Sequence, residues 1–363
     1  MRFRMHFDLF YELSNPNYPH QSDISIFNQV QSEITLADEL GFSTAWIVEH
    51  HFTEKYSHSS APDLFLASLA SQTKNIRLGH AIIPLPYNHP VRVAERLATL
   101  DVISNGRVEF GFGRGYSPIE YQCFDADMAK SREITQEAFE IILKCLLEQT
   151  FKHSGDFFSL PEINVLPKPI QKPHPPIWTA AVSPDSFQLA AKLGIGVLAG
   201  PFKPWFMVKE DIRLYRNSWQ TVDHSSSNIN LNNKTGMTIG ILCLENAKQA
   251  RQSGKVAFEW FYQNLLLQTT PVLKKLYSSY EYYNKFSHFH KILSSTINLK
   301  ILETLGLVIV GSPNECIEKL EKIQAAGVDH FILSVGAGAI DSNIVKESIS
   351  LIASDVMPHF QQK

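Results

Sequence analysis

The sequence predicts a single-domain (β/α)8 barrel, or TIM barrel, that covers residues 1–363. Short apolar stretches with strand character alternate with longer helical stretches from end to end, and eight such strand and helix units fit into the chain. An open, doubly wound sheet usually has fewer strands and begins with a Gly-x-Gly-x-x-Gly turn, which neither end of the chain contains. Eight units in a chain of 363 residues therefore favour the barrel.

The first half of the chain contains the first four units. Charged and apolar residues alternate at the N-terminus, which indicates a strand and argues against an apolar signal sequence. Gly41 ends the first helix, and a proline begins each of the next two helices, in the turn where no N–H donor is needed. We expect strands over Phe3–Phe10, Thr44–Glu49, Ile76–Ile83 and Arg107–Phe112, followed in turn by helices over Asp23–Leu40, Pro62–Thr73, Pro90–Ile103 and Ser131–Glu148.

The second half contains the other four units and two interruptions. Prolines are frequent between Phe151 and Pro176 and cannot donate ladder hydrogen bonds, so we interpret this stretch as an excursion over the barrel surface. The insertion at about residues 268–307, after strand 7, has low regularity and is expected to form a lid, with disorder as the alternative. We expect strands over Ile177–Val182, Ile195–Ala199, Gly236–Leu244 and His330–Val335, and helices over 184–193, Trp205–Trp219, Ala247–Leu267, Pro313–Ala326 and Asp341–Met357.

The composition limits the partners and the compartment. A formal net charge of −3 and a pI near 6.5 provide no general attraction to nucleic acid or to an anionic membrane, so we expect neither as a partner. The cysteines are far apart and form no Cys-x-x-Cys pair, which argues against a zinc site, a redox motif or a disulfide scaffold. A reducing cytoplasm is the expected location. The cysteines are Cys123, Cys145, Cys243 and Cys316.

A cluster of titratable residues directly follows the second strand. Residues 46–48 are apolar, and Glu49, His50 and His51 follow before any turn residue. Side chains alternate along a strand, so Glu49 and His51 should point to one side and His50 to the other. At the C-terminal end of a barrel strand, a histidine that faces the lumen can donate or accept a proton. Alternatively, the three side chains only bind loop backbone. Their spacing is unlike that of paired metal ligands on a helix, so we expect no metal.

Two turns and one helix start predict an anion site. Gly113 and Gly115 flank Arg114 where the fourth strand ends, so backbone amides and a guanidinium can approach one anion together. Ser183 begins a Ser-Pro-Asp-Ser turn that caps a helix and leaves later amides free for a phosphate. Arg132 lies at a helix start, where a bound anion would offset its unfavourable position. A flexible turn at Arg114 and an ordinary cap at Ser183 are the alternatives.

Several short sequence runs occur along the chain in a characteristic order. They are Glu-His-His-Phe-Thr-Glu at 49–54, His-Pro-Val-Arg-x-Ala-Glu at 89–95, Gly-Arg-x-x-Phe-Gly at 106–111, Asp-Met at 127–128, Ser-Arg at 131–132, Gly-Ser-Pro-x-Glu-Cys at 311–316 and Ser-Asp-Val-Met-Pro at 354–358. Over essentially the whole chain, this series resembles the bacterial luciferase-like flavin monooxygenases, in particular the alkanal monooxygenase branch. The resemblance implies a barrel that binds reduced FMN, reacts it with O2 to a flavin C4a-hydroperoxide and oxygenates an aldehyde or a ketone.

The resemblance also implies roles for individual residues. His50 would be the catalytic histidine, and we include its neighbour Glu49 in the predicted catalytic site. Ala81 and Ile82 would form a non-prolyl cis peptide under the flavin ring, and Trp260 matches an aromatic position near the flavin, although it could equally be helix core. The predicted contacts to the FMN phosphate are Arg114, Arg132, Ser183 and Ser186.

Gly113 marks a departure from the luciferase catalytic subunit, although we include it among the predicted cofactor-binding residues. That subunit has a reactive cysteine where this chain has Gly113, so no role for a thiol and no light emission are inferred. Substrate specificity is not predicted.

The resemblance implies partners and leaves alternatives open. No nicotinamide fingerprint is visible, so a separate flavin reductase is expected to supply reduced FMN. Luciferase-like barrels pair, here through the helices after the second and third strands, so a homodimer or a heterodimer with a related barrel is expected. Hydride transfer with FMN or a deazaflavin, a non-catalytic flavin-binding partner subunit and a metal-dependent hydrolase are the competing functions.

Overall fold

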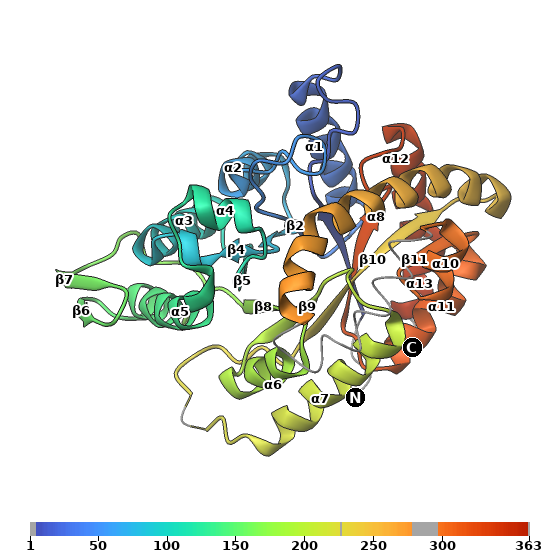
Figure 1. Cartoon of the computed structure of the whole chain (residues 1–363). Coiled ribbons are helices and arrows are strands. Elements are labelled where there is room, and N and C mark those ends of the chain that lie inside the picture. The colour runs from blue at the N-terminus through green and yellow to red at the C-terminus, as the bar shows by residue number, and fades with distance from the viewer. Residues whose placement is uncertain (1–4, 226, 278–296, 362–363) are drawn as a thin grey trace.

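Eight parallel strands pair edge to edge and close into the barrel that the sequence predicts (Figure 1). The structure is a computed structural model that describes residues 5–225, 227–277 and 297–361. In ring order the barrel strands are β1 (His6–Tyr11), β2 (Thr44–Ile47), β3 (Arg77–His80), β5 (Val108–Gly113), β8 (Ile177–Ala181), β9 (Gly196–Ala199), β10 (Thr235–Cys243) and β12 (His330–Val335). The ring closes because β9 pairs with β10 and β12 pairs with β1, both in parallel.

Helices connect the strands and cover the outside of the barrel (Figure 1). Seven of them match the predicted helices within two residues at each end, and proline begins four of these, as the sequence predicts. These helices are α1 (Asp23–Glu39), α2 (Pro62–Gln72), α3 (Pro90–Ile103), α5 (Ser131–Leu147), α6 (Pro184–Leu193), α7 (Trp205–Thr221) and α11 (Pro313–Ala325). The last predicted helix is divided into α12 (Ser342–Leu351), a π-helical turn η3 (Ile352–Val356) and α13 (Met357–Gln361).

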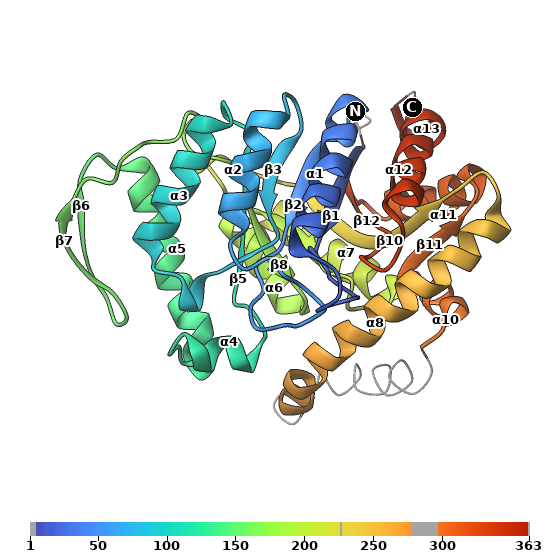
Figure 2. The same cartoon turned by 90° about the horizontal axis from the view of Figure 1, so that it is seen from above.

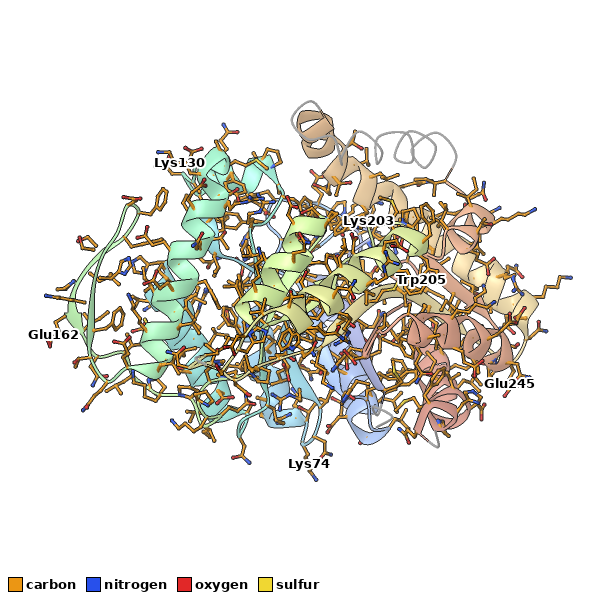
Figure 3. The ribbon with its side chains drawn as sticks, turned by 90° about the horizontal axis from the view of Figure 1, so that it is seen from below. Lys74, Lys130, Glu162, Lys203, Trp205 and Glu245 are labelled. Carbon is orange, nitrogen blue, oxygen red and sulfur yellow. The ribbon has the colours of Figure 1, made fainter. Side chains whose placement is uncertain are left out.

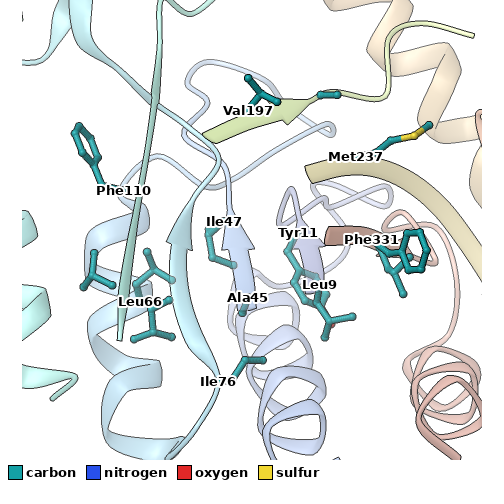
Figure 4. Packing of buried hydrophobic residues seen from close by; sticks show 14 of the residues in the cluster. Leu9, Tyr11, Ala45, Ile47, Leu66, Ile76, Phe110, Val197, Met237 and Phe331 are labelled. Carbon is teal, nitrogen blue, oxygen red and sulfur yellow. The ribbon is translucent and has the colours of Figure 1, made fainter. Parts of the chain in front are cut away.

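The side chains of β1 alternate between the two faces of the barrel wall. Leu9 and Tyr11 belong to the layer between the strands and the outer helices (Figure 4), whereas Phe10 belongs to a cluster inside the barrel. Asp8 also points inward, and its Oδ2 accepts a hydrogen bond from His330 Nδ1 at 2.8 Å. This alternation decides which residues can reach the lumen at the end of each strand.

Two tryptophans fill much of the barrel interior. The rings of Trp46 and Trp178 meet edge to face, with their centroids 5.6 Å apart. Trp46 Nε1 donates to Asp8 Oδ2 at 2.9 Å, and Trp178 Nε1 donates to Glu109 Oε2 at 2.6 Å, so both buried indole N–H groups have acceptors. Gly79 makes room for one ring, because a Cβ there would lie 2.3 Å from Trp46. The interior is therefore a packed core below the C-terminal rim.

Several elements lie outside the predicted ones. The stretch predicted as a proline-rich excursion contains a β-hairpin, β6 (Phe151–Ser154) and β7 (Ser159–Ile163), that projects from the barrel (Figure 1). Both strands are edges of a two-stranded sheet, so Pro161 needs no ladder partner. The other short elements are β4 (Ile83–Pro84), η1 (Leu85–Tyr87), α4 (Pro118–Cys123), η2 (Met128–Lys130), α10 (Leu299–Thr304) and β11 (Val308–Gly311).

The predicted insertion differs from expectation at both of its described ends. Helix α8 (Ala247–Tyr277) continues ten residues beyond the predicted end at Leu267, through a proline that commonly stops helices. At the other end, α10 and β11 form regular structure, and β11 pairs in parallel with β10. Residues 278–296, the centre of the predicted lid, lie outside the described residues. No helix in the described ranges is long and apolar enough to span a membrane.

The C-terminal ends of the strands form one rim of the barrel. Lys130 and Lys203, which lie in segments that follow β5 and β9, are on one side of the molecule, and Lys74, which precedes β3, is on the other (Figure 3). Seen from above, α4 and one end of α8 lie on the side away from both chain termini (Figure 2). The predicted site residues at the ends of β2, β5 and β8 therefore share this rim.

Candidate active site at the C-terminal rim

His50 lies just beyond β2 and faces a pair of buried carboxylates. Its Nδ1 is 3.5 Å from Glu120 Oε1, and its Nε2 is 3.8 Å from Glu12 Oε2. Glu12 follows β1 and shares the inward face with Asp8 and Phe10, whereas Glu120 comes from the short helix α4. The carboxylate groups of both acids are almost completely buried. Both ring nitrogens of His50 therefore face acceptors.

Two tyrosines complete the surroundings of His50. Tyr116 Oη is 3.5 Å from His50 Nε2, and the rings of Tyr56 and Tyr116 lie against the imidazole, with centroids 5.7 and 5.4 Å away. Tyr56 Oη also donates to Glu12 Oε1 at 2.8 Å, which holds that carboxylate in place. The second oxygen, Glu12 Oε2, is buried and accepts no hydrogen bond from the described residues.

Electrostatics favour the protonated form of His50. Burial alone would disfavour the imidazolium, but the carboxylates of Glu120, Glu12 and Glu49 outweigh it and raise the pKa of His50. Burial also disfavours the charged form of Glu120, yet hydrogen bonds from His50, Tyr87 and the backbone N–H of His51 lower its pKa. The surroundings of His50 therefore shift its imidazole toward the protonated form.

Glu49 and His51 lie on the opposite side of the same segment, as strand alternation predicts. Glu49 Oε1 is 3.3 Å from His51 Nε2 and accepts from Asn88 Nδ2 at 2.8 Å. Both side chains line a cavity of about 140 Å3 together with Asp63 and other residues of α2 and α3. Glu49 therefore acts on His50 only through its charge, and its predicted catalytic role stays a prediction.

The residues predicted to underlie the flavin are adjacent in the structure. The Ala81–Ile82 peptide is cis, as the resemblance implies. Gly113 ends β5 beside it, and a Cβ at Gly113 would lie 3.0 Å from Ile82 Cδ1 and 3.4 Å from Ala180 Cβ. Ile82 thus occupies the space next to Gly113, which gives a steric reason for glycine where the luciferase catalytic subunit has cysteine.

The two predicted phosphate-binding arginines are exposed, and Tyr121 connects the segments that carry them. Arg114 follows β5, and its carbonyl accepts a hydrogen bond from Tyr121, whose phenol also interacts with Ser131 at the start of α5. Tyr121 therefore links the Arg114 turn to the helix that carries Arg132. No carboxylate of the described residues lies within ion-pair distance, 4.0 Å, of either guanidinium.

Ser183 and Ser186 make the helix cap that the sequence predicts. Ser183 Oγ accepts from the Ser186 N–H, and Ser186 Oγ accepts from the Ser183 N–H at 3.0 Å, which is a capping box. The cap follows β8, which pairs with β5 in the register Phe112 with Thr179. The start of α6 is therefore the neighbour of the Arg114 turn along the rim, and the phosphate role of the two serines stays a prediction.

Trp260 of α8 is partly buried and lines a second cavity, of about 590 Å3. Phe10 and Glu12 line the same cavity, so Trp260 faces a space that adjoins the His50 cluster. It also packs against a small apolar cluster under α8. Trp260 therefore faces a cavity and also packs in the helix core, and its place near a flavin stays a prediction.

Two acids around His50 and one buried cation were not predicted from the sequence. Glu12 follows the first strand at an inward position, and the alternation of that strand could have revealed it. Glu120 lies on a short helix with no sequence signal of its own. Lys203 Nζ donates to the Val182 carbonyl at 2.6 Å, next to the α6 cap, and pairs with Asp211. Burial lowers the pKa of Lys203, and Asp211 opposes that effect.

Comparison with known proteins agrees with this geometry. The chain is 27% identical over 334 residues to an alkanal monooxygenase alpha chain from the Kryptophanaron alfredi symbiont, which covers 90% of this chain and 91% of that protein. It is 32% identical over 199 residues to the oxygenase component of a flavin-dependent trigonelline monooxygenase from Acinetobacter baylyi, which covers 54% of each.

Solved structures share the whole barrel. The monooxygenase RslO1 from Streptomyces bottropensis superposes with a TM-score of 0.82 at 27% identity, over 98% of this chain and 100% of that one. The oxygenating constituent of a Pseudomonas putida 3,6-diketocamphane monooxygenase, solved with FMN, has a TM-score of 0.78 at 20% identity, over 98% of each chain. A coenzyme F420 dependent tetrahydromethanopterin reductase from Methanopyrus kandleri has a TM-score of 0.70 at 19% identity, over 99% of this chain and 100% of that one. These last two share the fold.

A family model provides the wider assignment. The model of luciferase-like monooxygenases matches residues 5–330, which is most of the chain and includes every residue of the candidate site described above. With the closed barrel and the histidine at its C-terminal rim, this match shows that the chain belongs to the luciferase-like monooxygenase family.

Proposed function

We propose that the protein is a flavin-dependent monooxygenase that uses reduced FMN and O2 to oxygenate a small aldehyde or ketone. The observation that carries this proposal is the lumen-facing His50, held between Glu12 and Glu120 on the rim that also bears Arg114. Bound reduced FMN would supply two electrons and activate dioxygen, so that one oxygen atom enters the substrate and the other leaves as water.

The residues of the rim fit an FMN phosphate. Arg114 and Arg132 have no acidic partner among the described residues, so an anion between them would gain charge-assisted hydrogen bonds without breaking an ion pair. Ser183 and Ser186 lie at the start of α6, where the helix dipole favours a negative group. Gly113 lies beside the Ala81–Ile82 cis peptide, so it adjoins the surface on which a planar ring would rest.

His50 would act on the substrate carbonyl as a proton donor. Oxygen transfer to an aldehyde or ketone builds negative charge on the carbonyl oxygen, and an imidazolium within hydrogen-bond reach stabilises that charge more than it stabilises the free substrate. Glu12 and Glu120 keep the proton on His50 and restrict the orientation of its ring. The opposite assignment, with His50 as a base, needs the same position but a neutral imidazole.

Hydride transfer with FMN or a deazaflavin is the second candidate, because the reductase from Methanopyrus kandleri shares the barrel. A partner subunit that binds flavin without catalysis is the third. The monooxygenase proposal is favoured by the agreement of the chain with relatives named as monooxygenases over most of its length.

A labelled-oxygen experiment separates these candidates. The protein is incubated with FMN, a flavin reductase, NADH, 18O2 and a panel of aldehydes and ketones, and products are analysed by mass spectrometry. We expect one 18O atom in the product of at least one substrate. A reduced product without label would identify hydride transfer, and no product from any substrate with intact FMN binding would identify a non-catalytic flavin protein.

The supply of reduced FMN and the oligomeric state are part of the proposal. The relative from Acinetobacter baylyi is named an oxygenase component, which supports a separate reductase for this chain too. Support for pairing through α2 is weaker than the sequence suggests, because Phe65, Leu69 and Ala70 are buried within the barrel itself and Leu64 is the one strongly exposed apolar residue of this helix. Light scattering at micromolar concentration tests the dimer, and a monomeric mass would exclude it.

A further inference from the structure

The cavity of about 590 Å3 extends from the His50 site to the outer layer of the barrel. Glu12 and Trp260 line its inner end, and Glu12 Oε2 is 3.8 Å from His50 Nε2. Val30 and Glu33, on α1, line its outer end behind β1. The volume lies within the range of small-molecule sites, so a substrate with its reactive group at His50 can place the rest of its structure here.

The charged side chains that line this cavity are the acids Glu12, Glu33 and Asp341, and none of its described lining residues is Lys, Arg or His. Glu33 is 1% exposed, and its Oε1 accepts from Ser342 Oγ at 2.7 Å. Tyr11 is 8% exposed, and its hydroxyl, beside Glu33, has no hydrogen-bond partner of normal geometry among the described residues. At the inner end, Glu12 Oε2 also accepts no hydrogen bond.

A buried polar atom without a hydrogen-bond partner destabilises a protein unless a ligand satisfies it, and the Tyr11 hydroxyl and Glu12 Oε2 are such atoms. A cationic nitrogen with N–H groups would provide a donor to the Tyr11 oxygen and a positive charge to the Glu33 carboxylate, which already accepts from Ser342, and apolar walls that include Val30 and Trp260 would hold the hydrocarbon part. An anionic ligand would be repelled by the carboxylates of Glu12 and Glu33. The chemistry of the lining thus selects the class of ligand.

We propose that this cavity is the substrate chamber and that it selects substrates that carry a protonated amine on an apolar frame, with the ammonium group held by Glu33 and Tyr11. The inference rests on the proposed function for the reaction at the His50 end, but the binding step that it describes does not need flavin.

The protonation state of Glu33 determines the conditions of the test. Burial raises the pKa of Glu33 to about 7, and Ser342, Gln29, Tyr11 and the Lys346 ammonium of α12, which does not line the cavity, oppose that rise. The Glu33 carboxylate is therefore largely ionised at pH 8, where an alkylammonium ion is still charged. At pH 5.5 Glu33 is mostly protonated, and the preference for a cation should decrease.

Three probes of equal chain length test the charge preference on the unaltered full chain without FMN. Isothermal titration calorimetry at pH 8 compares hexylamine, 1-hexanol and hexanoate. We expect hexylamine to bind at least about tenfold more tightly than 1-hexanol, and hexanoate to bind most weakly. Equal affinity for the amine and the alcohol, or a preference for hexanoate, would overturn the proposal without recourse to any variant.

A matched pair of variants locates the ammonium group. Glu33→Gln should remove most of the preference for hexylamine over 1-hexanol, whereas Glu39→Gln, an exposed acid on the same helix, should leave it unchanged. An unchanged preference in Glu33→Gln would refute the assignment to Glu33. Amine binding with no 18O incorporation would count against the proposed function alone, and 18O incorporation with no amine preference would count against the chamber alone.

Discussion

The two sides of the C-terminal rim differ in how their charges are balanced. On the side formed by β1, β2 and α4, the charges are buried and paired, because His50 lies between Glu12 and Glu120. On the side formed by β5, α5 and α6, Arg114 and Arg132 are exposed and have no acidic partner among the described residues. The first side pairs its one imidazole with two acids, whereas the second has a positive excess.

This difference assigns separate tasks to the two sides. A paired and buried acid-base cluster is arranged before any ligand arrives, as proton transfer requires. Unpaired cations near a helix start are suited to an anion that comes and goes, such as the phosphate of FMN. Changes on the first side should therefore alter turnover and its pH dependence, and changes on the second should alter FMN affinity.

The largest effect is expected from the loss of the imidazole at the centre of the first side. His50→Ala should lower formation of oxygenated product by ~10²- to 10⁴-fold, the usual contribution of a positioned proton donor or acceptor. FMN affinity should change little, because the proposed phosphate site lies on the other side of the rim. Product and hydrogen peroxide are measured in parallel in single-turnover experiments with reduced FMN.

His51→Ala is the matched control, because the neighbouring histidine faces Glu49 and Asn88 instead of the lumen. We expect its product yield to stay within about tenfold of that of the unaltered protein. Full product yield from His50→Ala, or equal losses of product in the two variants, would contradict a specific role for His50 in the reaction.

On the second side, Arg114→Ala should weaken FMN binding by about ten- to a hundredfold, which corresponds to one or two charge-assisted hydrogen bonds. Riboflavin, which has no phosphate, should bind the variant almost as well as the unaltered protein. Arg92→Ala is a suitable control, because Arg92 is an exposed arginine of α3 whose nearest acid is Glu95. Equal losses for FMN and riboflavin in Arg114→Ala would remove Arg114 from the phosphate site.

The main elements of the fold could be predicted from the sequence because their signals are local. Proline at the start of α3 and the Ser183 cap of α6 gave boundaries that agree with the structure to within a residue. Strand β11 and hairpin β6–β7 escaped prediction, because four or five residues of ambiguous pattern are stabilised by pairing with another segment. Helix α8 continues through a proline, so the local stop signal was overridden there.

Residues of the candidate site could be predicted from the sequence only where they lie in one short segment. His50 and its opposition to His51 follow from alternation along the segment that continues β2, and the direction holds in the structure. The partners of His50 come from distant segments: Glu12 is 38 residues earlier and Glu120 is 70 residues later, and no periodicity connects them. These acids meet His50 only in the folded barrel, so their pairing with it could not be predicted from the sequence.

The acids on the first side should set the pH at which activity changes. Because Glu120 raises the pKa of His50, Glu120→Gln should lower that pKa and leave burial as the dominant influence. The limb of the pH–rate profile that reports His50 should therefore move to lower pH. A limb on which activity falls as pH rises identifies His50 as a proton donor, and a limb on which activity rises identifies it as a base.

Glu49→Gln serves as the control for this shift. The Glu49 carboxylate raises the pKa of His50 less than Glu120 and Glu12 do and lies on the outer face, so its removal should move the limb less than Glu120→Gln does. NMR titration of the His50 ring would measure the same pKa without turnover. A larger shift in Glu49→Gln would show that charge at a distance outweighs direct contact at this site.

The smallest effect is expected at Arg132, and its sign is informative. Arg132 is the second residue of α5, where a cation opposes the helix dipole, so Arg132→Ala should stabilise the FMN-free protein by ~0.3–1 kcal/mol. The same change should weaken FMN binding, because the phosphate loses one positive neighbour. Chemical denaturation with and without saturating FMN measures both effects. If Arg132 is there to bind an anion, Arg132→Ala should raise stability without FMN and reduce the additional stability that FMN provides. Destabilisation in both conditions would instead make Arg132 an ordinary structural contact of the helix.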